Sequence, residues 1–150
     1  MSGMACTNQV KEEEDATELK FGPDFDVAQA LSMNEVMLIQ ESKVGDDRET
    51  YGEETSTTQT RVFEKTMAYA KRFANCTTQQ QAHNMREACV HAGLHDFEVA
   101  MFVNIVPQNY DEAKTLVPSL MAAGEDGKMR FDEHHIENLI SELNNIRQFD

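Results

Sequence analysis

The sequence has no tryptophan, only three prolines and three cysteines, and 13 basic residues against 27 acidic ones. No apolar run approaches the roughly 18 residues that a membrane-spanning helix needs, and no apolar stretch follows a basic start at the N-terminus. Three cysteines without a secretion signal predict reduced thiols rather than a disulfide framework. We therefore expect a soluble, intracellular protein without a membrane span or signal peptide.

The scarcity of positive charge argues against direct nucleic-acid binding. The formal net charge is -14, and such a field repels phosphates. The few basic side chains are scattered among acidic ones instead of forming a stripe, as shown by Lys65, Lys71, Arg72 and Arg86. With 40% hydrophobic and 27% charged residues in 150, the chain is nevertheless typical of a globular domain with a real core.

Metal sites are suggested at two places, and neither has the required ligands. Residues 122–133 resemble a calcium loop with Gly127 at the sixth and Glu133 at the twelfth position, but Ala122 and Gly124 supply no side-chain oxygen at the first and third. The zinc candidates lack the short spacing of a knuckle; they are Cys76, Cys89, His91 and His95. We expect no metal and no cofactor.

Enzyme signatures are also missing from the sequence. There is no phosphate-binding glycine loop, no nucleophile elbow and no H-E-x-x-H. Cys89 and His91 are two positions apart on one predicted helix, so they do not face each other as nucleophile and base. We therefore expect no catalytic residues, and the remaining function class is protein–protein interaction.

The chain divides into four segments. Residues 1–15 are acidic and aperiodic, which predicts a disordered tail. Residues 16–44 predict an apolar extended arm followed by a helix, and residues 45–60 a flexible linker. Residues 61–150 carry helical periodicity, with amphipathic patterns over 60–75 and 77–93, an apolar helix over 94–107, a short turn of helix over 111–116 and a final helix from Asp132. The predicted class is all-α.

The arm and its helix contain more apolar surface than a small bundle can cover. Leu19, Phe21 and Phe25 surround the breaker pair Gly22-Pro23. The following helix begins with a capping box formed by Ser32 and Glu35, with Leu31 and Val36 as its hydrophobic staple. This region therefore predicts contact with a second polypeptide.

Three stretches carry a family resemblance: "LKFGPDF" (19–25), "YAKRF" (69–73) and "LHDFEVAMFVNIVPQNYDEAKTLVPSL" (94–120). They resemble subunit four of eukaryotic RNA polymerase II, from about residue 15 to the C-terminal "ISELNNIRQF". The resemblance implies a non-catalytic nuclear protein with a domain similar to the HRDC domain of helicases over 61–150. It also implies that the chain forms a heterodimer with subunit seven, the polymerase stalk, which supports initiation and handling of the emerging RNA. Nucleic acid would be contacted at most through the partner.

Carried over by position, the resemblance assigns two sets of residues. The expected contacts with subunit seven are Leu19, Phe21, Gly22, Pro23 and Phe25, with Leu31, Val36 and Leu38 as companions. The residues expected to hold the helical domain together are Phe97, Glu98, Pro107, Leu116, Pro118 and Leu120. The alternatives are the stalk subunit of another nuclear polymerase or an isolated HRDC-type module; the arm and the acidic charge favour the polymerase II subunit over a nucleic-acid-binding module.

Overall fold

The computed structural model describes residues 14–23, 25, 28–51, 61–76, 78–123 and 129–148. These contain six α-helices, α1 (Met33–Tyr51), α2 (Arg61–Phe73), α3 (Gln79–His91), α4 (Asp96–Ile105), α5 (Tyr110–Leu116) and α6 (Glu133–Gln148), and the 3-10 turns η1 (Ala16–Glu18) and η3 (Pro118–Met121). In this part of the chain the only β pairing is two isolated bridges. The all-α prediction is confirmed. The predicted tail, except residues 14 and 15, lies outside the described residues.

The helices begin where local sequence signals place them. At the start of α1, the Glu35 N–H donates to Ser32 Oγ (3.3 Å), and Glu35 Oε2 accepts from the Ser32 N–H (2.8 Å). Thr78 forms the corresponding capping box at α3. Asp132 Oδ1 accepts from the N–H of His135 (2.7 Å) at the start of α6. Each cap satisfies amides that the first helical turn leaves without an intrahelical partner.

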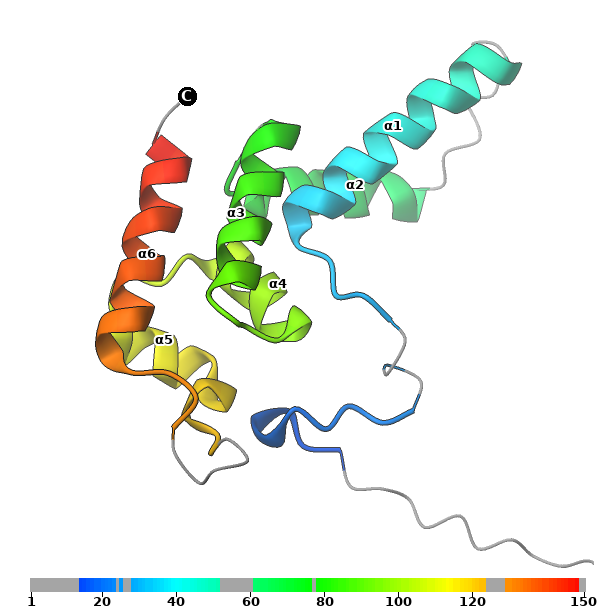
Figure 1. The fold of residues 1–150 in the computed structure, drawn as a ribbon. Helices are drawn as coiled ribbons and strands as arrows, with labels where there is room; N and C mark the ends of the chain where they lie inside the picture. Colours follow the sequence, from blue (N-terminus) through cyan, green and yellow to red (C-terminus); the bar gives the residue numbers. More distant parts are fainter. Residues whose placement is uncertain are drawn as a thin grey trace, which may run out of the picture.

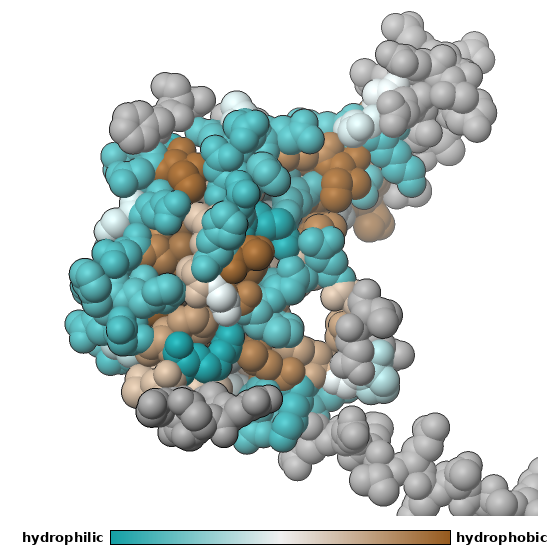
Figure 2. Space-filling view, viewed as in Figure 1, coloured by the Kyte–Doolittle hydropathy of each residue, from teal (hydrophilic) through white to brown (hydrophobic). Residues whose placement is uncertain are grey.

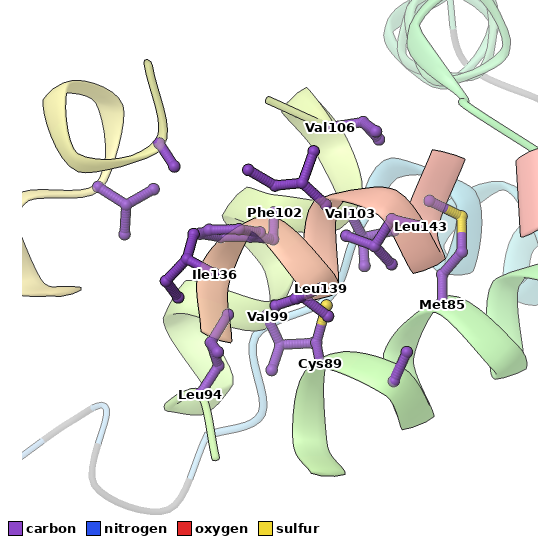
Figure 3. Close-up of a cluster of buried hydrophobic side chains, with 14 of the residues drawn as sticks. Met85, Cys89, Leu94, Val99, Phe102, Val103, Val106, Ile136, Leu139 and Leu143 are labelled. Carbon is purple, nitrogen blue, oxygen red and sulfur yellow. The ribbon is translucent and has the colours of Figure 1, made fainter. Parts of the chain in front are cut away.

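Three helices enclose the hydrophobic core. Helix α3 packs against both α4 and α6, and α5 packs against α6; Figure 1 shows α3 between α6 and the α1–α2 pair. Figure 3 shows side chains from α3, α4 and α6 converging, among them Met85, Phe102, Ile136 and Leu143. All four are fully buried, so this cluster supplies the main hydrophobic stabilisation.

Helices α1 and α2 pack on each other at the edge of this body. Helix α1 continues to Tyr51, so the prediction that a flexible linker begins at residue 45 is wrong; residues 52–60 lie outside the described part. The amphipathic pattern predicted over 60–75 forms α2, but its apolar side chains are only partly buried: Phe63 and Met67 are half-buried, and Phe73 is 47% exposed. Val62 is 73% exposed, and Ala70 is the buried residue of that helix. The reason is that α2 has α1 as its main neighbour rather than the core.

A buried carboxylate joins α4 to the segments that precede α6. Glu98 is fully buried and forms a two-pronged ion pair with Arg130, with Nη1–Oε1 at 2.8 Å and Nη2–Oε2 at 3.0 Å. Ser119 Oγ and the N–H of His95 also donate to it, at 2.6 and 2.7 Å. A buried charge is tolerated when it is paired and hydrogen-bonded in this way. Glu98 therefore has the structural role expected from the sequence.

Candidate partner-binding site

The arm begins with a tight turn that its sequence dictates. Asp15 caps η1, and the backbones of Asp15 and Lys20 exchange two hydrogen bonds of 2.9 Å. Leu19 closes η1 in the left-handed region (φ 58°) and is half-buried. Gly22 has φ 79°, where a side chain is strained, and a Cβ there would lie 3.2 Å from Glu14 Oε1. The backbone conformation of this turn therefore favours glycine at position 22.

Phe21 faces its own helical domain. Its ring lies 4.9 Å from that of Phe97 and is stacked on His95 at 5.7 Å, measured between centroids. The turn η1 lies beside η3, so the beginning of the arm is attached to the body as well. The sequence assigned Phe21 to the partner and Phe97 to the domain, whereas the structure brings the two rings together.

The next part of the arm is open to solvent. Phe25 is 61% exposed, Leu31 is 40% exposed and Pro23 is exposed too. Between arm and body lies a hollow of about 590 Å³, visible in Figure 2. Its apolar lining consists of Ala16, Phe21, Phe25, Ala28, Ala30 and Phe97. Exposed aromatic and aliphatic side chains around a hollow are typical of a docking surface.

The three first-helix companions differ in their surroundings. Leu31 precedes α1 and is exposed, whereas Val36 is half-buried and Leu38 packs partly against the hydrophobic core. The adjacent Ile39, which the sequence analysis did not select, is 51% exposed. On a helical projection the side chains of Leu38 and Ile39 point about 100° apart. If Leu38 faces the core, Ile39 therefore faces away from it, and the projection would have indicated an exposed apolar residue there.

The base of the arm is held by Arg86 of α3. This guanidinium is paired with both carboxylate oxygens of Glu35, donates from Nη1 to Asp96 Oδ1 (2.7 Å) and donates from Nη2 to the Ala30 carbonyl (2.6 Å). Asp96 Oδ2 also accepts from the Ala30 N–H (2.6 Å). Four segments therefore meet at Arg86: the arm, α1, α3 and the start of α4.

The charges of this cluster stabilise one another. Hydrogen bonds to Glu35 are the largest cause that raises the pKa of Arg86, with Asp96 adding to it against the opposing effect of burial. Burial raises the pKa of Glu35, but hydrogen bonds from Arg86 and Ser32 outweigh it, and the net pKa is lowered. Arg86 and Glu35 are thus both charged at neutral pH.

Two asparagines complete the attachment of α1. Asn104 Oδ1 accepts from the N–H of Met33 (2.7 Å), which fixes the first turn of α1 on the end of α4. Asn34 is buried and its Oδ1 accepts from the N–H of Asn75 (2.8 Å), just after α2. Sequence reasoning missed both residues, because these bonds connect positions 71 and 41 residues apart.

The residues that the resemblance assigned to holding the helical domain together differ in their burial. Glu98, Pro107 and Leu120 are fully buried, as the resemblance implies, and Phe97 is half-buried beneath Phe21. Leu116 is 41% exposed and Pro118 is exposed too, so the structure does not bury these two residues as their expected role in holding the domain together would require. Leu116 is the last residue of α5, and Pro118 is the first residue of η3.

The described residues contain no group of three or more His, Cys, Asp or Glu side chains that could hold a metal ion. Within the same residues, no helix has both the length and the apolar character to span a bilayer. The geometry that is present, an exposed apolar arm joined to a helical body by ion pairs, is suited to protein binding. Fold and candidate site are therefore those of an all-α protein with an exposed apolar arm.

Comparison with known proteins gives the family. The sequence model of the family described as RNA polymerase Rpb4 matches residues 30–147. The chain belongs to this family, whose members are non-catalytic subunits of RNA polymerase II. The resemblance found in the sequence and the expectation that the chain is not an enzyme are thereby confirmed.

Three relatives match almost the whole chain. It is 32% identical over 140 residues to DNA-directed RNA polymerase II subunit 4 of Arabidopsis thaliana, covering 93% of this chain and 98% of the relative. Identity to DNA-directed RNA polymerase II subunit rpb4 of Dictyostelium discoideum is 33% over 152 residues, with 93% of each chain covered. The Schizosaccharomyces pombe subunit rpb4 is 31% identical over 138 residues, covering 91% and 94%.

Proposed function

We propose that this protein is a subunit of RNA polymerase II in the nucleus and pairs with subunit seven to form the polymerase stalk. In this role it supports transcription initiation and handling of the emerging RNA without catalysing a step. The relatives named above are all polymerase II subunits, so this assignment is preferred over a stalk subunit of another polymerase or an isolated HRDC-type module.

The observation that carries the proposal is the exposed apolar surface of the arm. Phe25 and Leu31 stay open to solvent although the rest of the arm is tied to the body at Phe21 and Ala30. An aromatic side chain that buries its surface on binding contributes much of the affinity of an interface. The eight residues from Leu19 to Leu38 selected from the sequence remain the proposed contacts, with Phe25 and Leu31 as the most accessible.

Mutation of the two exposed side chains tests the proposal. The double variant Phe25→Ala, Leu31→Ala is expected to bind recombinant subunit seven at least about thirtyfold more weakly, since a buried interface anchor contributes about 2 kcal/mol or more. Isothermal titration calorimetry measures the dissociation constant. The melting temperature should change little, because neither side chain belongs to the core.

A matched control separates the arm from general surface hydrophobicity. Leu116 has the same exposure as Leu31, 41% against 40%, but lies at the end of α5. Leu116→Ala should leave the dissociation constant within about twofold of the parent value. Equal affinity of parent and double variant would remove the arm from the interface, and a parent chain that ignores subunit seven would reject the proposed function itself.

A further inference from the structure

Ala30 is bound through both of its backbone polar groups to side chains of the helical domain. Its N–H donates to Asp96 Oδ2 and its carbonyl accepts from Arg86 Nη2, each at 2.6 Å. The two side chains are themselves paired, with Arg86 Nη1 2.7 Å from Asp96 Oδ1. A single residue of the arm is therefore held on both sides by a closed ring of charge-assisted hydrogen bonds, which are stronger than neutral ones.

The arm is fixed a second time at nearly the same place. Phe21 packs on His95 and Phe97, which flank Asp96 at the start of α4. Residues 21 and 30 are thus both held at the first turn of α4. Phe25, whose N–H donates to the Gly22 carbonyl (3.1 Å), lies in the loop between these two attachment points in the sequence.

We infer that Asp96 and Arg86 are positioning residues, which hold the arm in the conformation that presents Phe25 and Leu31 to the partner. This inference rests on the proposed pairing with subunit seven. Fixing both ends of the loop removes conformational freedom that binding would otherwise have to remove, and a preorganised segment binds more tightly. Arginine suits the position because its planar fork of five donors reaches Glu35, Asp96 and Ala30 together.

The test is a pair of identical substitutions at two helix starts. Asp96→Ala removes the bond to the Ala30 N–H and the ion pair with Arg86, and leaves Arg86 paired with Glu35. Asp132→Ala removes an equivalent bond to a backbone N–H at the start of α6, with no contact to the arm. Both variants should remain folded at the temperature of the titration, so a difference in affinity between them reports positioning rather than unfolding.

Two measurements on three variants of the full chain decide the matter. In Asp96→Ala, titration with recombinant subunit seven should give a dissociation constant about tenfold higher, and the Ala30 amide should exchange with deuterium about tenfold faster in the free protein. Asp132→Ala should change neither quantity by more than about twofold. Arg86→Lys, which keeps the charge but loses the fork, should fall between the parent and Asp96→Ala.

Each alternative result overturns the inference in a distinguishable way. Faster exchange at Ala30 with unchanged affinity would show that the anchor forms without contributing to binding. Unchanged exchange would show that Asp96 does not hold the arm in solution. If the parent binds subunit seven and Asp132→Ala weakens binding as much as Asp96→Ala, the effect is one of stability. If the parent does not bind at all, the proposed function fails and the positioning role fails with it.

Discussion

Replacing Arg130 by alanine is the sharpest test of how the helical domain is held together. Arg130 supplies two of the hydrogen bonds to the buried Glu98 carboxylate and also donates to the Ser119 carbonyl, at 3.4 Å. Its guanidinium lies over the Phe131 ring, 4.8 Å from the centroid. In Arg130→Ala, the carboxylate stays buried and keeps only the bonds from Ser119 Oγ and the His95 N–H.

The size of the effect follows from these contacts. Removing one partner of a buried ion pair costs about 3–5 kcal/mol, because an uncompensated charge is left behind. The two surviving hydrogen bonds and the 20% exposure of the Arg130 side chain favour the lower end, about 3 kcal/mol. For a chain of this length that corresponds to a melting temperature lower by about 6–12 °C.

Thermal and urea unfolding followed by circular dichroism measure this loss. A second variant, Glu98→Gln with Arg130→Met, leaves no charge in the interior and should recover a large part of the stability. Lys71→Ala is the control, since it breaks an exposed ion pair with Glu41 and should shift the melting temperature by no more than about 2 °C. If Arg130→Ala melts within about 2 °C of the parent, Glu98 is not the buried, paired carboxylate described above.

Two further predictions concern titratable groups. The pKa of Glu35 is subject to burial, which raises it, and to hydrogen bonds from Arg86 and Ser32, which outweigh burial and lower it below the ordinary 4.5. Its stabilisation is therefore complete above that value and is lost as the pH falls through the folded-state pKa. In urea titrations the stability difference between the parent and Glu35→Gln should shrink over that range; a constant difference down to about pH 2 contradicts this. Burial raises the pKa of Cys76 to about 11 and of Cys89 to about 12. Iodoacetamide at about pH 8 should leave both thiols unmodified in the native protein and alkylate both after unfolding. Peptide mapping that finds rapid native alkylation at either thiol contradicts this.

Local signals in the sequence were sufficient to predict the helix starts and the class of fold. The capping boxes at Ser32 and Thr78 and the cap at Asp132 depend on side chains within three residues of the amides they satisfy. The apolar periodicity of α3 and α6 likewise depends on one helix at a time. Such features are encoded by neighbouring residues, so they can be read without knowledge of the tertiary structure.

Features that depend on distant contacts could not be predicted in the same way. The end of α1 was missed because residues 45–51 have no apolar stripe, and a helix of that composition depends on its neighbours for stability. Arg86 was counted among scattered basic residues, yet its partners Ala30 and Glu35 lie 56 and 51 residues away. No periodicity connects these positions. The anchor of the candidate site is therefore a property of the fold.

Some apolar side chains of the arm pack on its own helical domain and others are exposed to solvent. This difference affects how the two subunits would assemble. Phe21 packs against Phe97, and both backbone polar groups of Ala30 are hydrogen-bonded within the chain. Phe25 and Leu31, in contrast, are exposed to solvent. A segment attached at both ends needs little further ordering when a partner arrives, so most of the surface buried on Phe25 would contribute to affinity rather than offset lost entropy. An arm held only by its partner would instead lose that advantage and bind more weakly for the same buried area. The ion pairs at Arg86 would thus connect the attachment of the arm to the strength of the proposed heterodimer.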